Sequence, residues 1–360
     1  MAKVRRIGVL TGGGDAPGLN AVIRAVVKAA SNQNIETLGI PDSYDGLLEA
    51  DRPYLLTRKD VVGILRMGGT ILGTINRGNP FAEPVQTSDG PKDYGDRCLE
   101  IFDKVDLGAV IAIGGDGTLT LSQRFYQLGM PIVGVPKTID NDIVGTVNCF
   151  GFDTAVSFAS DAIDRLHSTA AAHRRIMVVE VMGRYAGWIA LHAGVSGGAD
   201  VILIPEIPYD IDKVAEQIRQ RERFGAKFTI LVVAEGAKAV GGQTSVVSEA
   251  HGQFVERLGG VGHKLAAELE ARTGKEARTA VLGHLQRGGT PTAYDRVLAT
   301  RFGARAVDLV VRGQFGKMVA SHPPDIVPVS LSEVVGKVKT IPLEHDIIQT
   351  ARAIGISFGD

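Results

Sequence analysis

The chain has 360 residues, of which 44% are hydrophobic and 22% are charged, and its formal net charge is -1. A length above roughly 250–300 residues predicts two domains, because single hydrophobic cores stop growing near that size. The balanced charge excludes the basic excess of a nucleic-acid-binding protein, no apolar run approaches the ~18 residues of a membrane helix, and the N-terminus lacks a signal-peptide pattern, so we expect a cytoplasmic protein.

The first predicted elements are a strand at residues 7–10 and a helix at residues 19–30, joined by the loop Gly12-Gly13-Gly14-Asp15. Glycine-rich backbone before a helix suits an anion such as phosphate. The loop is not a Walker A motif, because no Gly-Lys-Ser/Thr closes it, and Pro17 replaces the third glycine of a dinucleotide fingerprint. A tight strand-to-helix turn without a ligand remains the alternative.

The second predicted strand, residues 109–113, ends in Gly114-Gly115-Asp116-Gly117-Thr118, and a helix follows to about Leu128. A carboxylate at this place can hold Mg²⁺, which binds through one or two carboxylates together with substrate phosphates. Alternatively, Asp116 serves as a helix N-cap, and both roles are compatible.

The third predicted strand runs to Val135 and ends in Pro136-Lys137-Thr138-Ile139-Asp140-Asn141-Asp142. In an extended turn, the alternate spacing of Asp140 and Asp142 points both carboxylates the same way. One carboxylate can then take a proton from an attacking hydroxyl while its neighbour assists. An Asx-rich turn without chemistry is the alternative.

Further strands are predicted at residues 176–181, 201–204 and 229–233, with helices at 212–221, 262–272 and from near Asp161 to Arg174. Alternating strands and helices indicate mainly parallel sheets covered by helices on both faces. We therefore expect an α/β fold of two Rossmann-like three-layer α/β/α domains, with the active site in the cleft between them.

A family resemblance rests on the combination of Gly-Gly-Asp-Gly-Thr, Pro-Lys-Thr-Ile-Asp-Asn-Asp, Met-Gly-Arg and Gly-His-Leu-Gln-Arg-Gly-Gly in this order. With these motifs the chain resembles the 6-phosphofructokinases over nearly its whole length. The resemblance implies a glycolytic kinase that phosphorylates the 1-hydroxyl of fructose 6-phosphate. We expect a donor domain of residues 1–150 plus about 286–335, and a fructose 6-phosphate domain of residues 151–285 plus about 336–360.

The resemblance also implies residue roles. Asp140 resembles the base that accepts the proton of the sugar hydroxyl, with Thr138 and Asp142 as its partners, and Arg184 resembles the arginine that stabilises the transferring phosphoryl. Asp116 resembles the Mg²⁺ ligand. The expected donor-binding residues are Gly14, Arg77, Gly117, Thr118 and Lys137.

Besides the catalytic residues, the expected sugar-phosphate contacts are Arg175, Met182, Gly183, Glu235, Arg278, His284 and Arg287. In the family, the residues that match Arg175 and Arg278 reach in from a neighbouring subunit. The resemblance therefore implies a homo-oligomer, either a dimer or a tetramer.

The phosphoryl donor stays open between ATP and pyrophosphate. Members that use ATP typically carry glycine at the positions of Gly117 and Lys137, whereas members that use pyrophosphate carry aspartate and lysine there. A glycine leaves room for the α-phosphate and the nucleoside, so we expect ATP, with pyrophosphate as the alternative. A second departure is that Arg77 is shifted by one residue from the family's usual arginine.

Two competing interpretations are a non-catalytic sugar-phosphate sensor and a kinase of the diacylglycerol or NAD type. The sensor would be favoured by loss of Asp116, Asp140 or Asp142, and all three are present. A kinase of the diacylglycerol or NAD type shares Gly-Gly-Asp-Gly-Thr, but Thr-Ile-Asp-Asn-Asp is not expected in it.

Overall fold

The protein is described by a computed structural model that covers residues 4–75, 80–82, 84–87, 90–248 and 257–360. The chain forms two compact units. The first unit comprises Met1–Ile139, Ile143–Asp153 and Arg287–Lys337, and the second comprises Asp140–Asp142, Thr154–Gln286 and Val338–Asp360. The chain therefore passes between the units several times.

The first unit is built on a seven-stranded sheet in its described residues, with the order β15-β14-β7-β6-β1-β2-β3. The inner pairs are parallel, and the edge strands β3 and β15 pair antiparallel. The strands are β1 (Arg6–Gly12), β2 (Glu36–Ile40), β3 (Tyr54–Leu56), β6 (Ala109–Gly114), β7 (Ile132–Pro136), β14 (Lys317–His322) and β15 (Asp325–Ser330). A separate hairpin joins β4 (Val85–Thr87) to β5 (Gly90–Lys92).

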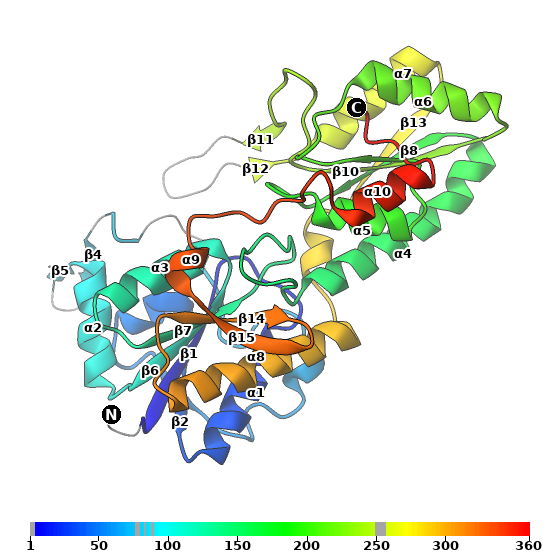
Figure 1. The fold of residues 1–360 in the computed structure, drawn as a ribbon. Helices are drawn as coiled ribbons and strands as arrows, with labels where there is room; N and C mark the ends of the chain where they lie inside the picture. The colour runs from blue at the N-terminus through cyan, green and yellow to red at the C-terminus, as the bar shows by residue number, and fades with distance from the viewer. Residues whose placement is uncertain (1–3, 76–79, 83, 88–89, 249–256) are drawn as a thin grey trace. The chain divides into compact units, whose positions relative to one another are not determined.

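Side chains alternate between the two faces of this sheet, so that each face has its own core. On β1, Ile7 and Val9 belong to one hydrophobic cluster, whereas Leu10 belongs to the other. Helices α1 and α8 pack together over the first cluster (Figure 1). The helical segments of this unit are α1 (Leu19–Asn32), η1 (Ser43–Leu47), η2 (Ile64–Arg66), α2 (Tyr94–Lys104), α3 (Asp116–Gln127), α8 (Ala293–Val311) and α9 (Leu331–Val334).

The second unit has a four-stranded parallel sheet in its described residues, ordered β13-β8-β10-β9. Its strands are β8 (Ile176–Val181), β9 (Val201–Leu203), β10 (Thr229–Ala234) and β13 (Ala277–Val281), and a short ribbon pairs β11 (Val246–Ser248) with β12 (Arg257–Leu258). The helical segments are α4 (Phe152–His173), α5 (Trp188–Ser196), α6 (Ile211–Arg223), α7 (Val261–Thr273), η3 (Gly283–Arg287) and α10 (Asp346–Ala353); α4 begins in the first unit, and η3 ends there.

The predicted mainly parallel α/β organisation is confirmed, and each of the predicted strands coincides with an observed one. The helix expected to begin near Asp161 was wrong in its start, because α4 begins at Phe152, directly after Gly151, which has φ 94°. Cys98 and Cys149 are buried and are not joined in a disulfide. Among the helices in the described ranges, none combines the length and the apolar character that crossing a membrane requires.

Candidate active site

Three of the predicted motif loops lie at one edge of the first unit's sheet. Strands β1, β6 and β7 are adjacent and parallel, and Gly12 aligns with Gly114, which aligns with Pro136. Their carboxyl ends therefore bring the starts of the three loops together, whereas Asp140–Asp142, at the end of the third loop, belong to the second unit. Strand order reverses here, since β2 follows β1 on one side and β7 follows β6 on the other. In open α/β sheets such a switch point is where ligands bind.

Two glycines of the first loop lie in close contact with neighbouring side chains. A Cβ on Gly12 would lie 2.5 Å from Oγ1 of Thr118, whose side chain is buried. A Cβ on Gly14 would lie 2.7 Å from Nη1 of Arg287. Gly13, Gly14 and Asp15 are half-buried, and glycine-rich backbone of this kind ahead of a helix suits phosphate.

Lys137 extends across this edge of the sheet. The residue is only 3% exposed, and its Nζ donates a hydrogen bond to the carbonyl oxygen of Gly14. A Cβ on Gly13 would lie 3.5 Å from the same Nζ. The structure thus places a buried cation directly against the first loop, where anionic phosphates would be bound.

The second loop holds Asp116 and Gly117 at the start of α3, and both residues are exposed. Gly115 is the helix N-cap, so Asp116 is the first helical residue and not the cap itself. A Cβ on Gly117 would meet no atom within 4 Å. The space in front of Gly117 is open, as the expectation of a nucleotide donor requires.

The side chains near the second loop fit a Mg²⁺ ion that is bound jointly with a phosphorylated ligand. Among the described residues no group of three or more His, Cys, Asp or Glu side chains could hold a metal. Mg²⁺ needs no such cage, because it binds through one or two carboxylates, waters and substrate phosphates. The exposed carboxylate of Asp116, beside the first loop's strand, matches that pattern.

Arg287 lies in the first unit and contacts the first loop. Its Nη1 donates a hydrogen bond of 3.1 Å to the carbonyl oxygen of Asp15, next to Gly14. Arg287 was expected among the sugar-phosphate contacts, but its guanidinium lies at the predicted donor loop. Arg77, the remaining predicted donor contact, lies outside the described residues.

The turn that carries Asp140 and Asp142 is not extended, which corrects the predicted geometry. Asn141, between them, is buried and has φ 53°, a left-handed conformation that asparagine tolerates better than most residues. The carbonyl oxygen of Asp142 accepts a hydrogen bond of 2.8 Å from the N–H of Lys339. The two carboxylates are therefore set by a kinked backbone, and alternation along a strand does not explain their directions. Thr138, immediately before this turn, is half-buried.

Another group of predicted residues follows the carboxyl ends of the second unit's strands. Met182, Gly183 and Arg184 come after β8, Glu235 after β10, and His284 lies in η3 after β13. The N–H of Glu235 donates to the carbonyl of Val181 at 2.9 Å, and the N–H of Gly236 donates to that of Gly183 at 3.1 Å.

A close approach fixes this pair of loops. A Cβ on Gly236 would lie 2.0 Å from the carbonyl oxygen of Arg184, so only glycine allows the two backbones to touch. The loops after β8 and β10 are therefore held side by side. Arg184 and Glu235 therefore lie on two backbone segments that are in contact with each other.

Arg175 and Arg278 lie at the opposite, amino end of the same sheet. Arg175 directly precedes β8, and Arg278 pairs with Met177 near the start of β8. Both guanidinium groups donate to the carboxylate of Glu276, and the hydrogen bond from Arg175 is the main reason that the pKa of Glu276 is lowered. Five steps of ~3.3 Å between Ile176 and Val181 separate the two ends of β8 by about 17 Å. Arg175 and Arg278 thus start from the other end of the strand than the loops that carry Arg184 and Glu235.

Glu206 was not among the predicted residues, and it supports the loop after β8. Its carboxylate accepts hydrogen bonds of 3.1 Å from the N–H of Gly187 and of 2.9 Å from that of Ile341. Burial raises the pKa of this carboxyl group. Glu206 thereby caps the start of α5 just beyond Arg184. Glu206 lies just after β9, and this position at the carboxyl end of a strand is the sequence feature that could have indicated its role.

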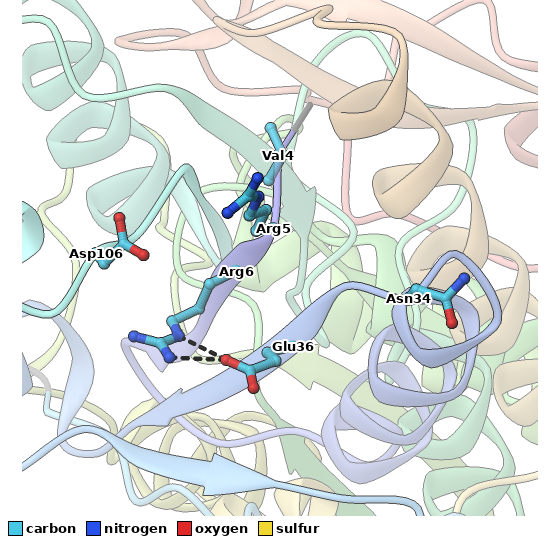
Figure 2. Close-up of a pocket in the computed structure, with 6 residues that line it drawn as sticks. All are labelled: Val4, Arg5, Arg6, Asn34, Glu36 and Asp106. Carbon is cyan, nitrogen blue, oxygen red and sulfur yellow. Dashed lines mark hydrogen bonds and ion pairs between the residues drawn. The ribbon is translucent and has the colours of Figure 1, made fainter. Parts of the chain in front are cut away.

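A hollow of about 460 Å³ lies at the other end of the first unit's sheet (Figure 2). Arg6 and Glu36 begin β1 and β2, and Nε of Arg6 donates to Oε2 of Glu36 at 2.9 Å. The residues that line it are Val4, Arg5, Arg6, Asn34, Glu36 and Asp106. None of them belongs to the predicted site, and the motif loops are at the opposite strand ends.

Comparison with known proteins gives a match along nearly the whole chain. Residues 6–310 match the family profile described as Phosphofructokinase. The chain is 52% identical over 359 residues to the ATP-dependent 6-phosphofructokinase of Chloroflexus aurantiacus, covering 100% of this chain and 99% of that protein. It is 47% identical over 367 residues to ATP-dependent 6-phosphofructokinase 2 of Clostridium perfringens, with 100% of both chains covered.

Solved structures show the same fold. The T-state phosphofructokinase of Pichia pastoris superposes with a TM-score of 0.81 at 30% identity, covering 92% of this chain and 35% of that one. This chain thus spans about a third of the yeast chain. The pyrophosphate-dependent phosphofructokinase of Marinobacter aquaeolei gives a TM-score of 0.79 at 23% identity, covering 98% of this chain and 91% of that one. At that identity the likeness concerns the fold alone.

Proposed function

Because the chain belongs to the phosphofructokinase family, we propose that it transfers a phosphoryl group from ATP to the 1-hydroxyl of fructose 6-phosphate, which gives fructose 1,6-bisphosphate in glycolysis. We choose ATP as the donor because the chain matches, over its full length, relatives that are named ATP-dependent 6-phosphofructokinases. The open space in front of Gly117 supports the same donor, because it leaves room for a nucleotide.

We assign the donor phosphates to the first unit. The amides around Gly14 and the start of α3 offer hydrogen-bond donors to anionic oxygens, and Lys137 adds positive charge against the same loop. The side chain of Thr118 packs against Gly12 and so supports the first loop. Pyrophosphate remains the second candidate donor, because a buried Lys137 would suit a leaving group that lacks a nucleoside.

Asp116 is the residue that would hold Mg²⁺, together with oxygens of the donor phosphates. When bound, the ion neutralises charge on the β- and γ-phosphate oxygens. The protein's contribution is to present this carboxylate at the start of α3, next to the amides that face the same phosphates.

We assign proton removal to Asp140. As the sugar 1-oxygen forms a bond to the γ-phosphorus, the bond from phosphorus to the β,γ-bridging oxygen breaks and ADP leaves with that electron pair. The proton of the sugar hydroxyl passes to the Asp140 carboxylate. Thr138 and Asp142 position this exchange, and Arg184 offsets the charge that develops on the transferring group.

We assign the sugar phosphate to the carboxyl end of the second unit's sheet. Met182, Gly183, Glu235 and His284 contact the sugar phosphate there, whereas Arg287, which contacts the first loop, is left with the donor side of the first unit. Such residues fix the substrate's orientation, so that only the 1-hydroxyl meets the donor.

We also propose a homo-oligomer in which Arg175 and Arg278 serve the site of a second copy. Their position at the amino end of the sheet supports this, because the residues to which we assign the sugar phosphate follow the carboxyl ends of the same strands. Glu276 holds both guanidinium groups at one place on the sheet's amino end. A symmetric pair would exchange such contacts reciprocally.

Mixing two inactive variants tests both the reaction and the sharing of sites. We expect Arg278→Ala and Glu235→Ala each to lose about 10–10² in kcat/KM for fructose 6-phosphate, because each removes a hydrogen bond to a charged or polar substrate group. Co-expression gives hybrids in which one site draws Glu235 from one variant and Arg278 from the other. Random pairing should restore about a quarter of wild-type activity.

The assay measures fructose 1,6-bisphosphate formed with Mg²⁺ and ATP. Hybrids that assemble, as judged by mass spectrometry, yet stay as inactive as the separate variants would contradict shared sites. Wild-type protein that forms no fructose 1,6-bisphosphate would contradict the reaction itself.

A further inference from the structure

Asn20 is a buried polar side chain that none of the assigned roles uses. It is the second residue of α1, five residues after Asp15 of the first loop, and only 1% of it is exposed. Buried amides are costly unless their donors and acceptors are paired. The contacts that satisfy Asn20 therefore indicate what it is for.

Asn20 binds the backbone of residues 67–71. Its Nδ2 donates to the carbonyl oxygens of Met67 at 3.2 Å and Gly68 at 3.1 Å, and its Oδ1 accepts from the N–H of Ile71 at 2.9 Å. Both amide hydrogens and the carbonyl oxygen are thus used on one short segment. We call these three hydrogen bonds, which hold residues 67–71 against α1, the Asn20 clamp.

The clamped segment forms no helix or strand, so side-chain contacts decide its path. It continues directly into residues that contact the first loop. Oγ1 of Thr11 donates to the carbonyl of Gly73 at 2.6 Å, and Oγ1 of Thr74 donates to that of Gly13 at 2.5 Å. The N–H of Gly13 in turn donates to the carbonyl of Ile75 at 3.0 Å.

The same segment also touches the backbone that follows Arg287. A Cβ on Gly68 would lie 2.4 Å from the carbonyl oxygen of Gly289. Two residues earlier in the chain, Arg287 donates to the carbonyl of Asp15 in the first loop. Asn20 therefore joins α1 to a segment that contacts the first loop at one end and the Arg287 segment at the other.

We propose that Asn20 is a positioning residue for the phosphoryl donor, acting through residues 67–75 on the loop around Gly13. It touches no substrate. By holding Met67, Gly68 and Ile71, it fixes the place from which Thr74 and Ile75 bind Gly13, and hence the backbone conformation of the loop to which we assign the donor phosphates. This inference rests on the proposed function for the identity of the donor and for its place at the first loop.

The test separates donor binding from general stability. Asn20→Asp keeps the side chain's size but removes both N–H donors and sets a carboxylate against two carbonyl oxygens. We expect the KM for ATP to rise about tenfold or more, the loss expected from breaking buried hydrogen bonds. The KM for fructose 6-phosphate should stay within about twofold.

A second pair of variants applies if Asn20→Asp does not fold. Thr74→Val removes the hydroxyl that binds Gly13 and should produce the same split between the two KM values. Thr74→Ser keeps the hydroxyl and should stay near wild type. Val319→Ala, in the buried β14 of the same unit, should lower the melting temperature without changing either KM.

Calorimetric titration with Mg²⁺-ATP alone checks the same point without turnover. Equal rises in both KM values, or an unchanged KM for ATP in Asn20→Asp and Thr74→Val, would overturn the positioning role. If wild-type protein used only pyrophosphate, the ATP assignment would fail, and the split would be measured against pyrophosphate. The two failures are thus distinguishable.

Discussion

Replacing Asp140 by asparagine should lower kcat by about 10²–10⁴, the range usual for loss of a general base. Asparagine keeps the size of the side chain but cannot accept the proton of the sugar hydroxyl. The KM for fructose 6-phosphate should change only a few-fold, because the contacts after β8 and β10 remain. Steady-state kinetics with saturating ATP and Mg²⁺ measure both parameters.

A matched control is Asp325→Asn, which makes the same chemical change at an exposed position that begins β15. It should retain wild-type kinetics. Asp140→Asn with a wild-type kcat would show that another group takes the proton. A large rise in KM with kcat unchanged would make Asp140 a binding residue instead.

Replacing Gly117 by aspartate should abolish most use of ATP, with kcat/KM for ATP falling on the order of 10²–10³-fold. A carboxylate at this position would face the donor phosphates, and like charges placed side by side cost several kcal/mol. The fold should tolerate the change, because a Cβ there meets no atom within 4 Å, and an acidic side chain suits the start of α3. The KM for fructose 6-phosphate should be unaffected.

Gly117→Ala separates volume from charge, since it adds only the Cβ to that open space. Its loss of ATP activity should be much smaller than that of the aspartate variant. Thermal unfolding should give similar midpoints for all three proteins. An aspartate variant that used ATP as well as wild type does would refute the assignment of Gly117 to the nucleotide.

The strands that build the site were predictable because they are continuous apolar runs. Residues in β6 and β7 are buried on both faces of a parallel sheet, so their sequence carries no polar interruption. By contrast, β14 and β15 form an antiparallel edge hairpin, and β15 is only half-buried. Because β15 is half-buried, its apolar pattern is too weak to predict a strand. The pairing of β14 with β7, which is distant in the chain, could not be predicted from local sequence.

Helix α4 shows a different limit. Its first turns carry small and polar residues together with Phe152, and the expected start near Asp161 followed the later, more charged stretch. The better signal was Gly151, which adopts φ 94° just before the helix. The left-handed Asn141 was likewise hidden, because a sequence does not report which asparagine leaves the extended region.

The candidate site was predictable as a set of loops but not as an arrangement. The motifs placed Gly14, Asp116 and Lys137 after strands, and only the strand order brought those strands side by side. The contact of Arg287 with Asp15 joins residues far apart in the chain. The clamp made by Asn20 had only a faint signal, a polar residue among the apolar residues that begin α1.

The identity of the donor is the claim on which the account depends most. Lys137 keeps pyrophosphate in consideration, and the open space at Gly117 favours ATP. The most direct measurement supplies purified protein with fructose 6-phosphate and Mg²⁺, adds either ATP or pyrophosphate, and follows fructose 1,6-bisphosphate through aldolase. The account predicts rapid product formation with ATP and a kcat/KM at least about 10²-fold lower with pyrophosphate, since only ATP gains contacts from its nucleoside. Faster turnover with pyrophosphate, or no product with ATP, would contradict it.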